Sequence, residues 1–290
     1  MRSMLNNAVN CTSDDLAKEQ PVIRRQARPG WVAIDFAELW RYRELVVFYA
    51  VRDIRVRYKQ TLLGVAWAVL QPVLTMLVFS IFFGTLARVP SDGIPYPIFS
   101  YCGLVPWQLF AYALTQSSNR IVEDAGVITK VYFPRLIVPL ASVIAGLVDF
   151  SIAFAVLMAM MFYYGIPLSI TILTLPLFTL IGLVAALAVG LWLSALNVRY
   201  RDVRYTIPFL AQFWLFVTPV AYSSSLVPAK WQALYAINPM VGVVNGFRWA
   251  LLGKTCPNPM VSVSLAATAV LLIGGLYYFR RMEKSFADII

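Results

Sequence analysis

Six long apolar runs, separated by short polar segments, constrain the fold of this chain more than any other feature. Each run is close to the ~20 residues that an α-helix needs to cross the hydrocarbon layer of a bilayer. Hydrophobic residues make up 60% of the chain and charged residues only 13%, far from the balance of a soluble domain. The sequence therefore predicts an all-α integral membrane protein with six transmembrane helices. We expect spans at about 62–87, 98–119, 136–163, 170–196, 205–222 and 260–279.

The distribution of Lys and Arg predicts how these spans are oriented. With six spans, 20 of the 24 Lys and Arg residues lie on one side of the membrane. The other side has Arg88, Lys230, Arg248 and Lys254. Because an excess of cations marks the cytoplasmic side, both termini are expected in the cytoplasm. The clustering of cations in these loops also argues against nucleic acid as a partner, despite a net charge of +10.

The region before the first span divides into a polar tail, 1–35, and an amphipathic segment, 36–60. Val47, Ala50, Val51, Ile54 and Tyr58 follow helical spacing, and Asp53 and Arg57 are spaced as an i, i+4 ion pair. Such a helix is expected to lie in the membrane interface, with its cations toward the headgroups. It serves either as an anchor or as a surface that also touches a cytosolic partner. The cations of this interface helix are Arg52, Arg55, Arg57 and Lys59.

The stretch Arg120–Arg135 lies between two apolar runs and carries five charged residues. Unpaired polar groups cost several kcal/mol in hydrocarbon, so this stretch must be a loop, and its cations favour the cytoplasmic side. Gly126 and Pro134 bracket one short helix along the membrane face. Our hypothesis is that a soluble partner pushes here on a membrane-embedded transport unit. The contact residues would be Val127, Ile128, Lys130, Tyr132, Phe133 and Arg135.

The outer segment 223–259 is too apolar for a free loop. Pro228 and Asn238-Pro239 mark two helix starts, and each helix is too short to cross the membrane. We expect two re-entrant helices that dip in from the outer face, which is allowed only where backbone packs on protein or lines a cavity. They form a candidate gate. Its residues are Trp231, Tyr235, Asn238, Pro239, Phe247 and Trp249.

Asp149 is the only ionisable residue deep in a predicted span, where a charge costs roughly 2.5–3.5 kcal/mol on insertion scales. It is either a proton or cation site of an ion-coupled carrier, or an aspartate paired with a neighbouring helix. Because the sequence contains no histidine, a proton relay through Asp149 would lack a second side chain to accept the proton. In the fourth span, small residues recur every four positions and predict close approach of another helix. They are Gly182, Ala186, Gly190 and Ser194.

Aromatic residues in the spans have two interpretations. They form packed or lipid-facing stripes, or they line a pore on which sugar rings slide by stacking. The channel candidates are Trp67, Tyr101, Trp107, Phe110, Phe209, Phe213 and Phe216.

The sequence offers little for catalysis. Without histidine and with one buried acid, no nucleophile–base pair, carboxylate dyad or metal cluster can be assembled. Cys11, Cys102 and Cys256 are far apart and are interpreted as free thiols. Gly253-Lys254-Thr255 lacks the upstream glycine of a phosphate loop, so we expect neither an enzyme nor a cofactor on this chain.

Five segments in order resemble the membrane subunits of type-2 ABC exporters, in particular the permeases that export O-antigen and related cell-surface polysaccharides. They are RYKQTLLGVAWAVLQPVLTMLVFSIFFG (57–84), GLVPWQLFAYAL (103–114), VITKVYFPRLIVP (127–139), NVRYRDV (197–203) and INPMVGVVNGFRWALLG (237–253). The resemblance implies a transmembrane domain over 61–282, followed by a cytoplasmic tail, 283–290. It also implies a homodimer in the bacterial inner membrane, with two cytosolic ATPase subunits that hold ATP and Mg²⁺.

That complex would drive a lipid-linked polysaccharide outward through a channel. By resemblance, 127–135 would be the coupling helix, 36–60 the interface helix and 228–251 the outer gate helices, with aromatics of the first and fifth spans facing the channel. Two alternatives stay open. The cargo could be teichoic acid or another lipid-linked polymer, or the chain could be an ion-coupled carrier that uses Asp149.

Overall fold

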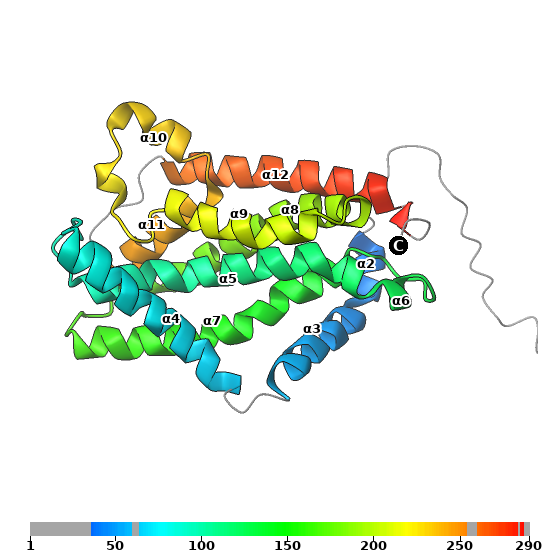
Figure 1. The fold of residues 1–290 in the computed structure, drawn as a ribbon, viewed down its shortest axis with the longest axis horizontal. Coiled ribbons are helices and arrows are strands. Elements are labelled where there is room, and N and C mark those ends of the chain that lie inside the picture. Colours follow the sequence, from blue (N-terminus) through cyan, green and yellow to red (C-terminus); the bar gives the residue numbers. More distant parts are fainter. Residues whose placement is uncertain (1–35, 60–63, 254–259, 284, 287–290) are drawn as a thin grey trace, which may run out of the picture. The chain divides into compact units, whose positions relative to one another are not determined.

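The structure is a computed structural model that describes residues 36–59, 64–253, 260–283 and 285–286. The described residues form helices and no strand, which confirms the all-α prediction (Figure 1). The tail 1–35, and with it Cys11, lies outside the described residues, as does Cys256. The elements are α2 (Phe36–Arg41), α3 (Arg43–Tyr58), α4 (Gly64–Phe79), η1 (Ser80–Leu86), α5 (Tyr96–Glu123), α6 (Ala125–Ile128), α7 (Ile137–Tyr163), η2 (Ile170–Thr174), α8 (Leu175–Arg199), α9 (Val203–Val217), η3 (Ser224–Leu226), α10 (Ala229–Tyr235), α11 (Pro239–Leu252) and α12 (Met260–Glu283).

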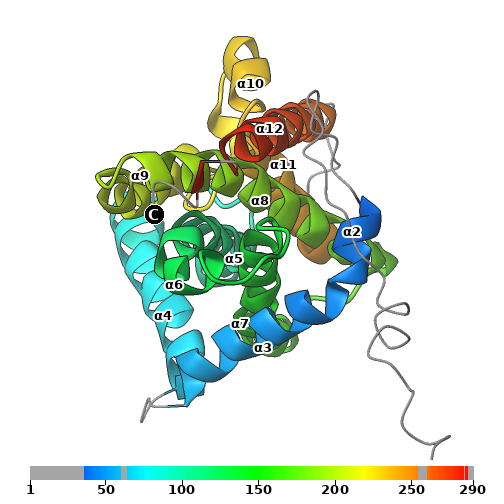
Figure 2. The same ribbon diagram turned by 90° about the vertical axis from the view of Figure 1, so that its right-hand side faces the viewer.

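Helix α5 is the centre of the helical body. It packs against α4, α7, α8, α9 and α11, and its buried residues extend from Ile98 to Ile121 (Figures 1 and 2). Because protein surrounds α5, its surface can carry hydroxyls. Ser117 and Ser118 are both fully buried and donate to the carbonyl of Leu114, at 3.2 and 2.6 Å.

Among the described residues, four helical stretches are long and apolar enough to cross a membrane. They are Ala66–Leu86, Ile137–Tyr163, Ile170–Arg199 and Met260–Glu283. These correspond to the first, third, fourth and sixth predicted spans. Helix α9 is apolar but shorter than a span, and α5 is long but less apolar. The lower hydropathy of α5 follows from its position, because a helix that faces other helices does not need a continuous lipid-facing surface.

The small-residue ridge of α8 packs closely, as the sequence predicts. A Cβ placed on Gly190 would lie 2.0 Å from Oγ of Ser117 on α5. One placed on Gly182 would lie 3.5 Å from Val243 on α11. The ridge therefore contacts α5 at Gly190 and α11 at Gly182. Only the contact at Gly190 is too close to admit a side chain.

Helix α3 crosses α7 obliquely (Figures 1 and 2). Its location in the membrane interface stays a prediction. Near the middle of α3, the Tyr49 ring lies 5.8 Å from that of Phe133. At the C-terminal end of α3, Arg57 pairs at 2.5 Å with Asp149, near the middle of α7. The ion pair gives the carboxylate of Asp149 a partner on a neighbouring helix, which is the second of its two predicted interpretations.

The outer segment forms two helices where the sequence predicts them, with Pro228 and Asn238 as the N-caps of α10 and α11. The two helices are not equivalent, however. Nearly all of α11 is buried against α5, α8 and α12, whereas α10 contacts α12 and exposes Trp231 and Leu234. Within the subunit, one outer helix is therefore buried and the other is exposed, and the insertion of both helices from the outer face stays a prediction.

Candidate functional site

The loop after α6 and helices α2 and α3 together form an open groove of about 500 Å³. Its inner end is aromatic, with Tyr49 and Phe133 both buried. Burial, helped by the nearby Asp124 carboxylate, raises the pKa of the Tyr49 phenol above its ordinary value, so this ring stays neutral. The rim exposes Phe48, at 64%, and Tyr132, at 69%. We call this surface the coupling groove.

The predicted contact residues of the loop divide by burial. Ile128 and Phe133 are buried and anchor the loop, whereas Val127, Lys130 and Tyr132 are exposed. Only the exposed group can meet a partner without refolding of the loop.

Arg135 is held by the end of α12 instead of facing outward. Its backbone N–H donates to Oε1 of Glu283 at 3.1 Å, and its guanidinium donates to the Glu283 carbonyl. The same guanidinium lies 5.8 Å from the centre of the Phe286 ring. Arg135 therefore ties the loop to the C-terminal helix.

The short helix expected between Gly126 and Pro134 covers only α6, and residues 129–134 are turns and bends. Two local causes explain the difference. β-Branched residues such as Val127, Thr129 and Val131 favour helix weakly, and Pro134 disfavours helical backbone at the residue before it. A helix of this length also has little stability of its own.

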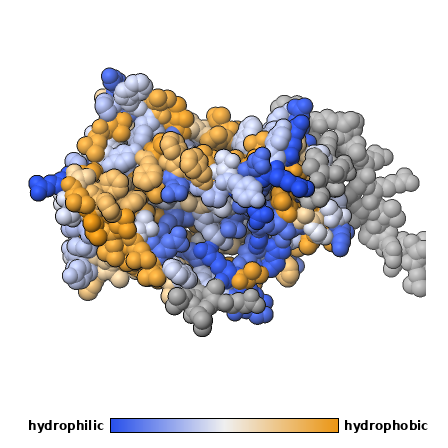
Figure 3. All heavy atoms as spheres, in the orientation of Figure 1, coloured by the Kyte–Doolittle hydropathy of each residue, from blue (hydrophilic) through white to orange (hydrophobic). Residues whose placement is uncertain are grey.

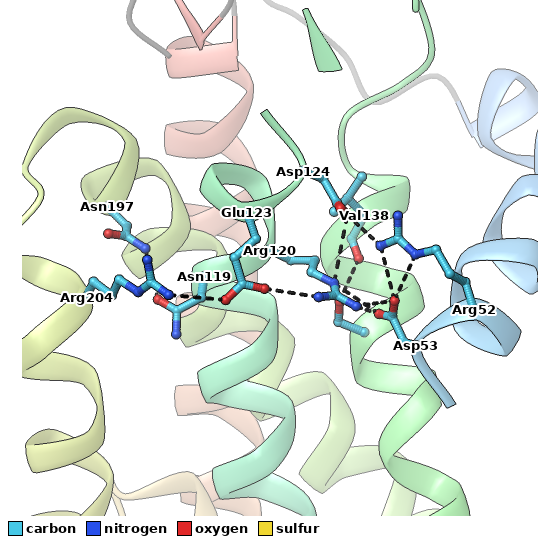
Figure 4. A network of polar contacts seen from close by, with 10 residues as sticks. Arg52, Asp53, Asn119, Arg120, Glu123, Asp124, Val138, Asn197 and Arg204 are labelled. Atoms are coloured by element: carbon cyan, nitrogen blue, oxygen red, sulfur yellow. Dashed lines mark hydrogen bonds and ion pairs between the residues drawn. The ribbon is translucent and has the colours of Figure 1, made fainter. Parts of the chain in front are cut away.

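A network of ion pairs connects the coupling groove to the helical body (Figure 4). Asp53 of α3 is buried, accepts from Arg52 at 3.1 Å and pairs with Arg120 of α5. Arg52 also contacts Asp124 at 2.6 Å, at the start of α6. The loop, α3 and α5 therefore share one set of charges.

The network continues to α9 through Glu123. Arg120 contacts Glu123 at 3.0 Å, and Glu123 lies 3.8 Å from Arg204 of α9. Beside it, the Asn197 amide of α8 donates to Asn119 at 3.0 Å (Figure 4). We call Arg52, Asp53, Arg120, Glu123, Asp124 and Arg204 the charge relay.

The expected i, i+4 pair between Asp53 and Arg57 does not form. Asp53 joins the charge relay, and Arg57 pairs with Asp149, whose carboxylate also accepts from Tyr58. An exposed pair within one helix is worth a few tenths of a kcal/mol, so partners on other helices prevail. The other two predicted cations of α3, Arg55 and Lys59, are exposed.

The channel candidates also divide by burial. Tyr101 and Phe110 are fully buried inside the subunit, and Trp107 is 4% exposed. The exposed candidates are on α4 and α9, which both pack on α5 and lie on the same side of it in Figure 2. They are Trp67, Phe209, Phe213 and Phe216, each more than half exposed.

A family model described as ABC-2 type transporter matches residues 44–252, which is most of the chain. The match includes the charge relay, α11 and the coupling groove except for Arg41 and Tyr42. The chain belongs to the ABC-2 type transporter family. This ABC-2 permease is a multi-pass membrane subunit, and ATP binding resides on a partner ATPase subunit.

Curated relatives of this ABC-2 permease match it over nearly their whole length. The O-antigen export system permease protein RfbA of Myxococcus xanthus is 29% identical over 257 residues, 87% of this chain and 98% of the relative. The protein of the same name from Klebsiella pneumoniae is 28% identical over 248 residues, 85% and 95% respectively. The polysialic acid transport protein KpsM of Escherichia coli is 25% identical over 241 residues, 81% and 92% respectively.

The outer gate candidates of this ABC-2 permease have different environments. Phe247 is fully buried and Pro239 is buried at the start of α11, whereas Trp231 is 53% exposed. The Tyr235 hydroxyl donates to that of Tyr222 at 2.9 Å. Trp249 is partly buried, and its ring lies 6.5 Å from the Phe178 ring.

Arg248 is a residue that the sequence analysis counted only as an outer cation. Its side chain is 4% exposed, and it donates to the carbonyls of Val220 at 2.8 Å and Tyr222 at 3.1 Å. Its guanidinium lies 3.6 Å from the centre of the Phe99 ring. Arg248 thus fastens the segment after α9 to α11 and α5. The one sequence feature that could have indicated this role is the position of a cation among the apolar residues of α11.

Asn238 joins three outer elements through one side chain. Its Oδ1 accepts from the Met240 N–H and from Nε1 of Trp214, both at 3.0 Å, and its Nδ2 donates to Thr218 at 3.0 Å. We expect Asn238→Ala to cost ~1–2 kcal/mol, because a helix cap and two further bonds are lost. The melting temperature of the purified permease should fall by about 2–8 °C. A shift no larger than that of Ser225→Ala, an exposed residue of η3 in the same outer segment, would contradict this role.

Proposed function

We propose that this permease exports a lipid-linked cell-surface polysaccharide of O-antigen type across the inner membrane. A homodimer of the chain would work with two cytosolic ATPase subunits. The observation that carries the proposal is the coupling groove, because it is continuous with a charge relay that leads into α5 and α9. The cargo is inferred from the relatives that carry O-antigen export in their names.

In this proposal the permease has six spans and both termini in the cytoplasm. Helix α5 is the second span, since its 28 residues are long enough to cross. Helix α9 and the residues after it form the fifth span. The coupling groove then faces the cytosol, where the ATPase is available.

Binding of the ATPase at the groove would move α3 and the loop together, because Tyr49 and Phe133 pack against each other there. Arg52 and Asp53 would pass that displacement to Arg120 on α5. Glu123 would extend it to Arg204 on α9. A partly buried set of paired charges transmits such movement well, since separating one pair leaves charges without partners.

The channel would form where two subunits bring their α4 and α9 faces together. Trp67 and the three phenylalanines of α9 supply exposed aromatic surface there. Such rings contact sugars without imposing a fixed hydrogen-bond pattern, which suits a polymer that has to slide. Tyr101 and Phe110 would instead support α5 from inside the subunit.

The alternative cargoes share this chemistry, so teichoic acid and other lipid-linked polymers remain variants of the same proposal. The ion-coupled carrier is less favoured. It needs Asp149 to bind a proton or cation, and this carboxylate is already paired with Arg57 and bonded by Tyr58.

The test of the proposal is Tyr132→Asp in the complex of permease and ATPase. The change replaces an exposed aromatic ring on the rim of the groove by a charge, so we expect a roughly tenfold or greater loss of bound ATPase and of glycan export. Tyr163→Asp is the matched control, because Tyr163 is 84% exposed at the opposite end of α7. Export by the Tyr132→Asp complex at the Tyr163→Asp rate would refute the docking role.

Orientation has its own measurement. In a variant without the native cysteines, we expect Lys130→Cys to react with a membrane-impermeant maleimide only when the reagent has access to the cytosolic side of the membrane. Labelling of intact spheroplasts at this position would place the groove outside the cell, and the proposed coupling would fail.

A further inference from the structure

A cavity of about 420 Å³ with both polar and apolar walls lies within the helical body, between the end of α3 and helices α4, α5 and α7. This volume is within the ~300–1,000 Å³ range of small-ligand sites. In Figure 3 the surface between α3 and α4 is hollowed and hydrophilic, beside the apolar surface of α4. Polar walls inside a membrane body are costly unless water or a polar ligand occupies the space.

Three glutamine amides line the cavity: Gln71 of α4, and Gln108 and Gln116 of α5. Within the described part of the chain, none of these amides has a hydrogen-bond partner. On α5 the two glutamines are eight residues apart, with Tyr112 between them, so one helix face supplies these groups. Each amide both donates and accepts, which matches ligands that carry hydroxyl groups.

Aromatic surface accompanies the amides. Trp67 and Trp107 line the cavity, and Trp67 is 51% exposed at its wall. Flat apolar faces beside amide groups suit a sugar ring, which has an apolar face and a rim of hydroxyls. A lipid chain would gain nothing from the amides.

The charges on the wall favour a neutral ligand over a phosphate. Among the described residues, the lining has two charged side chains, Arg57 and Asp149, and they pair with each other at 2.5 Å. The Arg57 guanidinium also lies 4.5 Å from the centre of the Tyr112 ring. Because the carboxylate compensates the guanidinium, the cavity has no net charge to offer an anion.

We propose that this cavity binds a neutral glycosyl unit of the exported polymer, through Gln71, Gln108, Gln116 and Tyr112 with Trp67 as a stacking surface. The inference rests on the proposed function, since it assigns a holding site to the same polysaccharide. The cavity lies beside the α4 and α9 faces, and Leu215 of α9 is part of its lining. A unit held there would keep the polymer from slipping back between ATP-driven steps.

The experiment uses photo-crosslinking in exporting cells that contain the complete transporter. p-Benzoylphenylalanine is introduced at Gln108, at Phe213 on the proposed channel face, and at Ile273 on α12, which is 70% exposed and away from the cavity. The probe is the cell's own polysaccharide, detected as a glycan-stained ladder on the purified permease. We expect adducts at Gln108 and Phe213 and none at Ile273.

The outcomes separate the two proposals. Adducts at Phe213 but not at Gln108 would overturn the cavity site and leave the exporter intact. Absence of adducts at both positions would count against polysaccharide export itself. Adducts at Ile273 of equal strength would show non-specific capture, and the cavity site would again be lost.

A cavity-filling variant gives a second readout. Ala68 lines the cavity, whereas Ala66, on the same helix, is exposed and outside it. We expect Ala68→Trp to slow export roughly tenfold and to abolish the Gln108 adduct, while Ala66→Trp exports normally. If Ala68→Trp does not assemble with the ATPase, the volume-conserving pair Gln108→Leu and Gln116→Leu takes its place. Export at the parental rate by whichever variant assembles would overturn the proposal.

Discussion

Replacement of Asp53 by Asn is expected to destabilise the permease by about 3 kcal/mol, the lower end of the range for breaking a buried ion pair. Asp53 is 7% exposed and is the shared partner of Arg52 and Arg120. The amide keeps the shape of the side chain but removes the charge that compensates two guanidiniums. The lower end applies because those two arginines keep 28% and 17% exposure and can recruit water.

Thermal unfolding of the purified permease measures this loss. About 3 kcal/mol corresponds to a fall in melting temperature of roughly 6–12 °C, at the ~2–4 °C per kcal/mol that applies to chains of about 150–250 residues. Arg55→Ala is the matched control, because Arg55 is exposed on the same helix. Equal melting temperatures for the two variants would show that Asp53 does not hold α3 to α5.

The same variant also tests the charge relay as a mechanical connection. At a temperature where Asp53→Asn is still folded, we expect ATP hydrolysis to continue while glycan export per ATP falls. A merely structural role would lower both in proportion to the amount of folded complex. A ratio equal to that of the Arg55→Ala complex would remove Asp53 from the coupling path.

Replacement of Gly190 by Leu should have the largest effect on packing. A Cβ at this position would lie 2.0 Å from Oγ and 3.1 Å from Cβ of Ser117, and 3.8 Å from the Leu114 carbonyl oxygen. Overpacking a well-packed core costs ~1–3 kcal/mol, occasionally more, and here it separates α8 from the central helix. We expect little monodisperse permease by size-exclusion chromatography.

Two companions make this result specific. Gly182→Ala, on the same ridge, adds a methyl at an ordinary contact distance of 3.5 Å from Val243 and should be tolerated. Gly190→Ala should destabilise the permease. Adding Ser117→Ala to that variant should restore part of the lost stability, because the 2.0 Å contact is with the Ser117 hydroxyl. Additive effects of the two substitutions would mean that α5 and α8 do not meet at Gly190.

Features with a local cause were predictable from the sequence. The starts of α10 and α11 follow from a proline and an asparagine, because capping involves neighbouring residues. The length of α6 was overestimated for a related reason. The helix begins at Ala125, next to the predicted Gly126, but it ends at Ile128, well before Pro134. Residues that limit a helix do not supply the packing energy that a short helix needs.

Features that depend on distant residues were not predictable. Asp53 and Arg57 have the right spacing for each other, yet each binds a residue at least 67 positions away. The aromatic residues were equivalent by composition, and only the fold distinguished Tyr101 in the core from Phe213 on an open face. The three glutamines gave no signal in the sequence, because their significance lies in sharing one cavity.

Hydrophobic length, loop charge and capping residues alone determined that this chain is helical, embedded in a membrane and punctuated by polar loops. These properties follow from the cost of exposing backbone and charge to hydrocarbon, which acts on each segment separately. The tertiary structure decided which charges pair, which outer helix is buried and where a polar cavity forms. Those outcomes depend on several helices competing for the same partners, and no single segment carries that information.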